Sequence, residues 1–142
     1  MAITSAICNS FKQEILVGTH DLTASTGDTF KLALFTSSAT LGASTTAYST
    51  SNEVSGTGYS AGGATLTSVT PVLDSSTAVC DFSDVSFTSA SFTANGCLIY
   101  NSSQSDKAVC AIAFGSDKTV TTGTFTIQFP TADASNAIIR IA

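Results

Sequence analysis

The chain has 142 residues, of which 43% are hydrophobic and 11% charged, and its formal net charge at pH 7 is -5. This length allows one domain with a buried core, and the ordinary hydrophobic share argues against disorder. The acidic balance, with only five Lys and Arg residues, argues against direct binding to nucleic acid, which needs a basic surface.

The first eight residues are expected to form an N-terminal arm. They lack the basic start and the long apolar run of a secretory signal. No stretch of the chain approaches the roughly 18 apolar residues that cross a bilayer. We therefore expect no membrane partner and a protein that stays in the cytoplasm of the cell that makes it.

Residues 9–18 (NSFKQEILVG) are the one good helix candidate. Ser10 followed by Gln13 has the form of a capping box, and Gly18 is placed to end the helix. Such a short helix needs a sheet to pack on, and its apolar face is expected to do so. The residues of that face are Phe11, Ile15 and Leu16.

The period of the hydrophobic pattern changes to two in residues 29–36 (TFKLALFT), which predicts a strand. The turn residues just before it suggest that residues 19–22 pair with this strand. Residues 37–63 then form a long polar stretch without clear periodicity. Loops of this length in a compact domain are usually functional or mobile.

The second half of the chain predicts a series of strands separated by turns. Pro71 and Pro130 fall at expected strand edges, where a missing amide donor does little harm. The expected strands are residues 64–69, 77–82, 85–92, 96–101, 107–114, 124–129 and 137–141.

This strand count predicts an all-β fold of two antiparallel sheets packed face to face, with one short N-terminal helix. We expect a single β-sandwich domain over residues 1–142, because no linker or change of composition divides the chain. A jelly roll fits the count of strands best, and an immunoglobulin-like sandwich is the alternative.

The four cysteines are too far apart in sequence for a zinc or redox motif, both of which need a close Cys pair. We expect buried free thiols that pack as small hydrophobic groups. A cross-strand disulfide between Cys97 and Cys110 is the alternative. The cysteines are Cys8, Cys80, Cys97 and Cys110.

Residues for chemistry are sparse. His20 is the one imidazole, Asp21 beside it should point to the opposite side of the chain, and no serine lies in a G-x-S-x-G turn. Asp81 and Asp84 fall short of a calcium loop. The glycine-rich stretch 56–63 lacks the G-K-[ST] ending of a phosphate-binding loop. We therefore expect an exposed or hydrogen-bonded surface histidine, no cofactor, no metal and no enzymatic activity.

Three stretches of the chain resemble small virion proteins of tailed bacteriophages. The resemblance implies a capsid cement or decoration protein, with a jelly-roll fold, that binds the outside of the major capsid protein shell. It also implies a homo-oligomer, either dimer or trimer, that joins the virion after synthesis in the bacterial cytoplasm. The stretches are NSFKQEILVGTH (9–20), TGDTFKLALFTSSATLGASTTAYSTSNEVSGTGYSAGG (26–63) and LIYNSSQSDKAVCAIAFGSDKTVTTGTFTIQFPTADASNAIIRIA (98–142).

We hypothesise that the 37–63 loop and the 1–8 arm make the contacts with the capsid or with other copies. Tyrosines and branched apolar residues of this kind anchor interfaces. The alternative is that the loop folds back and its tyrosines cap the core of the domain itself. The proposed interface residues are Ile3, Ile7, Leu41, Tyr48, Val54 and Tyr59.

Two other functions are open. One is a tail- or fibre-associated virion protein that binds a host glycan, although Trp is absent and only three Tyr residues could stack on a sugar. The other is a small hydrolase of envelope or glycan, which would need paired carboxylates in a setting that the sequence does not suggest.

Overall fold

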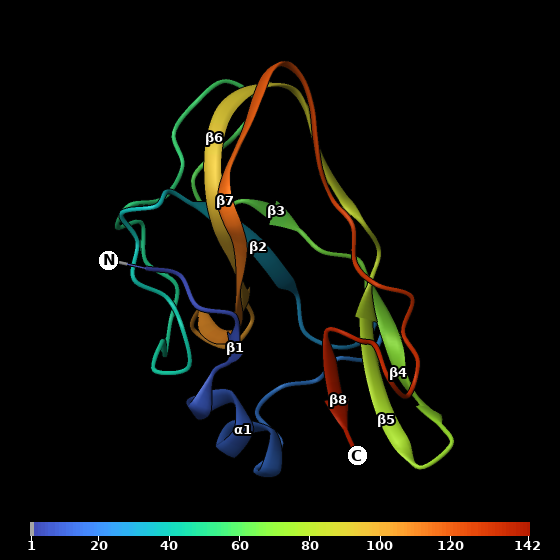
Figure 1. Ribbon diagram of the computed structural model, residues 1–142. Coiled ribbons are helices and arrows are strands. Elements are labelled where there is room, and N and C mark those ends of the chain that lie inside the picture. Colours follow the sequence, from blue (N-terminus) through green and yellow to red (C-terminus); the bar gives the residue numbers. More distant parts are fainter. Residues whose placement is uncertain (1) are drawn as a thin grey trace.

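The computed structural model describes residues 2–142, in which eight strands and one short helix form two antiparallel sheets (Figure 1). Met1, the first residue of the predicted arm, lies outside the described residues. The elements are β1 Ala6–Ile7, α1 Asn9–Leu16, β2 Phe30–Phe35, β3 Ala64–Thr65, β4 Ser68–Asp74, β5 Thr77–Phe82, β6 Val85–Asn101, β7 Lys107–Ile127 and β8 Ile139–Ile141.

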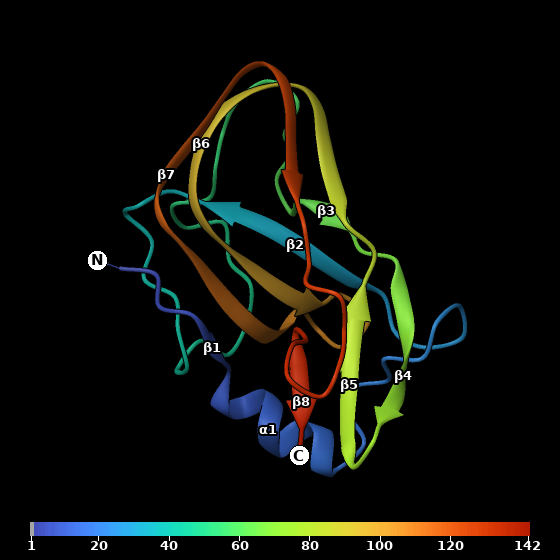
Figure 2. The same ribbon diagram turned by 45° about the vertical axis from the view of Figure 1, so that its right-hand side comes forward.

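The larger sheet has the strand order β1-β7-β6-β2-β3 and the smaller one the order β4-β5-β8. This mostly β architecture, with two antiparallel sheets and one helix, confirms the predicted class and is consistent with a β-sandwich. Seen from the side, the smaller sheet and α1 lie below the larger sheet (Figure 2). The core between these elements is built from β2, β6, β7 and the residues that cover them.

A bent hairpin of β6 and β7 dominates the fold. The two strands are 17 and 21 residues long, and their pairing shifts register at four places. The hairpin rises from the larger sheet, arches over, and returns toward β5 (Figures 1 and 2). The sequence predicted four separate strands here, at residues 85–92, 96–101, 107–114 and 124–129. That prediction was wrong because the polar residues between them continue the strands through the bend.

β2 lies beside β6 in the middle of the larger sheet, and its register with β6 runs without interruption from Phe30 opposite Asn101 to Phe35 opposite Gly96. Five of its six residues are buried. The predicted strand at residues 29–36 is therefore confirmed. Residues 19–22, predicted to pair with it, form no strand.

The helix α1 begins at Asn9, two residues earlier than a Ser10 cap would require. Cys8 is the N-cap residue, no side chain caps the helix, and the backbone amide of Cys8 donates to Val109 O in β7 at 2.9 Å. The predicted capping box was therefore wrong, because pairing of the preceding segment with β7 sets the start of the helix. Phe11 is buried as predicted, whereas Leu16 is 86% exposed.

The remaining differences concern strand ends. The predicted strand 64–69 is split into β3 and β4, and β4 continues through Pro71, where its register with β5 shifts. The predicted strand 77–82 matches β5, and the predicted strand 137–141 is shortened to β8. Pro71 is tolerated because β4 is an edge strand.

All four cysteines are free and buried, as predicted. Burial raises the pKa of the Cys8 thiol to about 11 and the pKa of Cys80 and of Cys97 to about 12. Burial also raises the pKa of Cys110 above its ordinary value. The thiols are therefore protonated at neutral pH and shielded from reagents.

The close approach of the 37–63 loop to β2 can be tested by comparing two glycines with positive φ, one in the loop and one outside it. A Cβ on Gly63 (φ +76°) would meet Leu32 O, whereas a Cβ on Gly18 (φ +77°), at the end of α1, would meet nothing within 4 Å. We predict that Gly18→Ala costs about 1–2 kcal/mol from the left-handed backbone alone. Gly63→Ala should cost at least about 2 kcal/mol more, because backbone must also move. Urea unfolding measures both, and equal losses would contradict the close contact.

The buried thiols generate a second prediction. In the native protein a thiol reagent should react with none of the four cysteines on the time scale of mixing. After unfolding in denaturant without reductant, it should titrate all four. A titre of two would reveal a disulfide and contradict the structure.

Candidate functional site

His20 lies in a buried polar chain that joins α1 to β6. Its Nε2 is 3.0 Å from Glu14 Oε1, and its Nδ1 is 3.0 Å from Asn101 Nδ2. Asn101 Nδ2 is a donor and also donates to Asp28 Oδ2 at 2.8 Å. His20 Nδ1 must therefore accept, which makes Nε2–H the donor to Glu14.

Both nitrogens of His20 are thus engaged by Glu14 and Asn101, and neither is left to activate a serine. The sequence predicted a surface histidine, and this was wrong, because the side chain is fully buried between α1 and the sheet. The predicted hydrogen bonding is correct. Asp21 is turned away and accepts from the backbone amide of Thr23 at 3.0 Å.

Glu14 anchors the other end of this chain. Burial raises its pKa, but the hydrogen bonds from His20 and Lys107 outweigh burial, so that the pKa of Glu14 lies below its usual value. The Lys107 Nζ is 3.2 Å from Glu14 Oε2. The pKa of Asp28 is likewise lowered, because hydrogen bonds from Asn101 and the Asp21 amide outweigh its burial. This series of polar contacts, from Lys107 through Glu14, His20 and Asn101 to Asp28, links α1 to the β6–β7 hairpin and is called the brace below.

The other two candidate carboxylates accept hydrogen bonds from backbone amides. Asp81 accepts from the amide of Phe82 at 2.8 Å, and Asp84 accepts from the amide of Phe129 at 2.9 Å. Within residues 2–142, no group of three or more His, Cys, Asp or Glu side chains is arranged to hold a metal ion. In the glycine-rich stretch, a Cβ on Gly58 would lie 2.8 Å from the Cα of Ala90, so the glycine allows the loop to approach β6 closely.

Glu53 organises the long loop 37–63. Its carboxylate accepts hydrogen bonds from the hydroxyls of Tyr48 at 2.7 Å and Tyr59 at 2.6 Å, and from the amide of Gly62 at 2.8 Å. The Tyr59 hydroxyl in turn accepts from the amide of Leu34 at 2.8 Å. Burial and the adjacent Glu53 carboxylate raise the pKa of both tyrosines. The loop is therefore fastened to β2.

Tyr48 also stacks on Tyr100, with ring centroids 4.5 Å apart. The amide of Val54 donates to Leu34 O at 2.9 Å. The loop thus folds back and its tyrosines cap the core, which is the alternative that the sequence left open.

The six residues predicted to form an interface differ in how deeply they are buried. Ile3 and Val54 are buried within the chain and are only 8% and 5% exposed. Ile7, Leu41, Tyr48 and Tyr59 are half-buried and pack against the core. Of the six, Ile7 alone lines the large groove described next, and the interface role of these residues stays a prediction.

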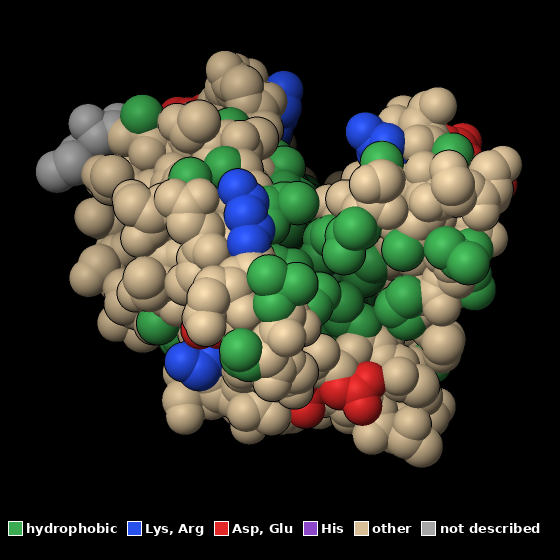
Figure 3. Space-filling view, turned by 90° about the horizontal axis from the view of Figure 1, so that it is seen from below, with side chains coloured by type: hydrophobic (Ala, Val, Ile, Leu, Met, Phe, Trp, Pro, Cys, Tyr) green, Lys and Arg blue, Asp and Glu red, His purple; other side chains and the backbone are tan. Residues whose placement is uncertain are grey.

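An apolar groove of about 800 Å³ lies between the larger sheet and the returning end of β7. Seen from below, hydrophobic side chains gather in a hollow between two largely polar lobes (Figure 3). The groove is lined by Ser5, Ala6, Ile7, Cys97, Cys110, Ala111, Ile112, Phe114, Lys118, Phe125, Thr126, Ile127, Gln128, Phe129, Pro130, Ala137 and Ile138.

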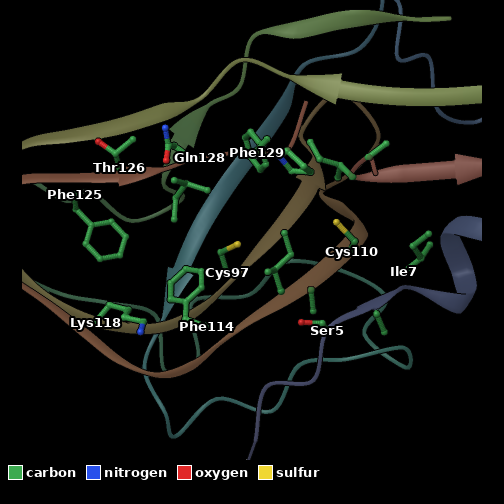
Figure 4. Close-up of a pocket in the computed structure, with 17 residues that line it drawn as sticks. Ser5, Ile7, Cys97, Cys110, Phe114, Lys118, Phe125, Thr126, Gln128 and Phe129 are labelled. Carbon is green, nitrogen blue, oxygen red and sulfur yellow. The ribbon is translucent and has the colours of Figure 1, made fainter. Parts of the chain in front are cut away.

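One side of the groove comes from the first half of β7, and the other from the end of β7 and the residues that follow it. Phe114 and Lys118 lie on one side, and Phe125 points toward them from the other, whereas the side chain of Gln128 points away from the hollow (Figure 4). Lys118 is the one charged residue of the lining. It forms no salt bridge with any described residue. The groove therefore offers an apolar surface with a single unpaired positive charge.

Comparison of the chain with protein-family models, with curated proteins and with solved structures gives no match. The resemblance to virion proteins thus stays a prediction. Within the described residues, no helix has the length and apolar character needed to span a membrane.

Sequence reasoning missed the groove. Its lining comes from five separate stretches, and only the bend of β7 brings them together. The one available signal was alternation in residues 124–129, which places Phe125, Ile127 and Phe129 on one face.

The brace predicts an acid-sensitive contribution to stability. Glu14→Gln should lower the free energy of unfolding by about 1–3 kcal/mol at neutral pH, because it removes a charged acceptor from His20 and Lys107. The pKa of Glu14 is lower in the folded than in the unfolded chain. Its contribution is therefore complete above pH 4.5 and is lost as the pH falls through the folded pKa.

Denaturant unfolding of the unmodified protein and of the Glu14→Gln variant, from neutral to acidic pH, measures this contribution. The difference between their free energies of unfolding should become smaller below pH 4.5. Asp117→Asn, an acid-to-amide change on the exposed part of β7, is the control and should show a smaller loss. A difference that does not change with pH would contradict the role of Glu14.

Proposed function

We propose that this chain is a structural protein of a bacteriophage virion, a capsid cement or decoration protein. It binds the outside of the major capsid protein shell and stabilises it across the seams between capsomers. It acts as a homo-oligomer, without a cofactor, and contacts neither nucleic acid nor membrane. The jelly-roll topology that the resemblance implies belongs to this proposal.

The observation that carries the proposal is the open apolar groove. Concave, mostly apolar surfaces lined by aromatic side chains are a common setting for a binding site. The groove combines three phenylalanines with one lysine, and aromatic residues are enriched in the cores of protein interfaces. The groove is therefore a candidate contact surface, either for shell subunits or for other copies of this chain.

The internal use of polar groups supports the same proposal. His20 and Glu53, which could have served catalysis, are both saturated by contacts within the chain. A cement protein also gains from repetition, because after the first contact of an oligomer the later contacts are intramolecular. Modest interfaces of about 1,000 Å² each are then sufficient.

The alternative is a tail- or fibre-associated protein that binds a glycan. Its aromatic platform would have to come from Tyr48, Tyr59 and Tyr100. All three hydroxyls make hydrogen bonds inside the chain, and two of the rings stack on each other. This use of the tyrosines favours the shell-binding proposal over the glycan-binding one.

The test is a copy count of the chain in purified virions, together with deletion of its gene. We predict several copies per capsomer, labelling over the whole head, and heads without the protein that lose DNA at lower temperature and under osmotic shock. Adding the purified protein back to deleted heads should restore resistance. Labelling at the tail alone, or heads of unchanged resistance, would overturn the proposal.

A further inference from the structure

We propose that copies of this chain associate head to tail, with the β4–β5 hairpin of one copy docked in the apolar groove of the next. The inference deepens the proposed function and rests on it for the expectation that the chain self-associates. It assigns the two surfaces that make the contact. The argument comes from the groove, from the exposure of β4, and from the distribution of charge.

The groove has an open strand edge beside it. β1 is the outer neighbour of β7 in the sheet, but it pairs only with Cys110 and Ala111. Ser5 Oγ extends this contact as far as the amide of Ala113. Beyond that point the outer edge of β7 has no strand partner among residues 2–142. An apolar surface next to an unpaired edge is suited to receive an extended segment.

The β4 strand is such a segment. It is the outer strand of the smaller sheet, and Val72 and Leu73 in it are 60% and 73% exposed. Adjacent residues of a strand point to opposite faces, so β4 lacks cover on both of its faces. Leu73 is also opposite Ala78, which is opposite the exposed Ile141 of β8, so the apolar surface continues across the sheet.

The charges of the two surfaces are complementary. The chain has no Lys or Arg between Lys31 and Lys107, so β4 and β5 carry only acidic charge, on Asp74 and Asp81. The cation beside them is Arg140 of β8, which donates a hydrogen bond to Ala134 O at 2.7 Å. Lys118, in the groove, is the unpaired cation described above. An apolar, acidic hairpin therefore matches an apolar groove with one positive charge, and the same match would not arise between two grooves or two hairpins.

The symmetry of the assembly follows from this pairing. Because donor and acceptor are different patches of the same chain, the contact is heterologous, and repetition closes into a ring when the rotation allows. A closed ring leaves no free groove and no free hairpin. This favours the trimer over the two-fold dimer among the oligomers that the sequence suggested.

The test measures the mass of the full chain in solution by light scattering and sedimentation velocity. The unmodified protein should form a closed oligomer. Leu73→Asp damages the hairpin and Lys118→Glu damages the groove, and each should weaken association at least tenfold. Mixing the two variants should give a one-to-one heterodimer, because one still has an intact hairpin and the other an intact groove.

Matched controls keep the outcome clear. Leu16→Asp and Lys12→Glu make the same two chemical changes on α1, outside the groove lining, and should leave the oligomer unchanged. Lys118 and Leu73 are exposed, so the variants should fold, and protection of the buried thiols verifies this.

Two results would overturn the inference. One is a monomer at the highest soluble concentration, and the other is a mixture of the variants that remains monomeric. The head-to-tail contact and the cement role can be tested separately. A monomer that still stabilises heads would refute the head-to-tail contact alone, whereas a ring that does not bind heads would refute the cement role alone.

Discussion

Two strands of 17 and 21 residues pair along nearly their whole length, and the bend in this hairpin determines most of the architecture. One half of each strand belongs to the larger sheet, while the other half returns toward β5. The four register shifts let the pair curve without losing its ladder, since extra residues increase local twist. The inside of the curve is filled by aromatic rings, with Phe92 in contact with Tyr59, Phe87 and Phe125. The groove is the part of the concave side that these rings do not fill.

The polar residues of the chain serve this architecture. A brace from Lys107 through Glu14, His20 and Asn101 to Asp28 ties the helix to the start of β7 and the end of β6. The Glu53 carboxylate fastens the long loop to the opposite face of β2. Unpaired buried groups are expensive, so each network also limits which conformations the loops can adopt. Within the described residues, Ser10 Oγ is the one buried side-chain oxygen or nitrogen without a partner.

The sequence was sufficient where the local pattern decides the structure. Alternation predicted β2 within one residue at each end, turn residues predicted β5, and the setting of Cys80, Cys97 and Cys110 in apolar runs predicted their burial. It was insufficient where distant contacts override a local signal. Ser10 resembles a cap, but Cys8 is held by β7; residues 93–95 resemble a turn, but they continue β6 across the bend. The groove could not be predicted because it exists only after β7 has turned back on itself.

The order of strand pairing also affects how the chain is made. β1 pairs with β7 and β2 with β6, so the earliest strands to leave the ribosome wait for partners that are translated much later. Only the hairpin of β4 and β5 and the short contact of β3 with β2 can form before then. Folding is therefore expected to be slow for a domain of this size, because the loop-closure entropy of non-local pairing is lost before the contacts form. Until β6 is made, a nascent chain would expose the apolar residues of β2, which favours aggregation at high concentration.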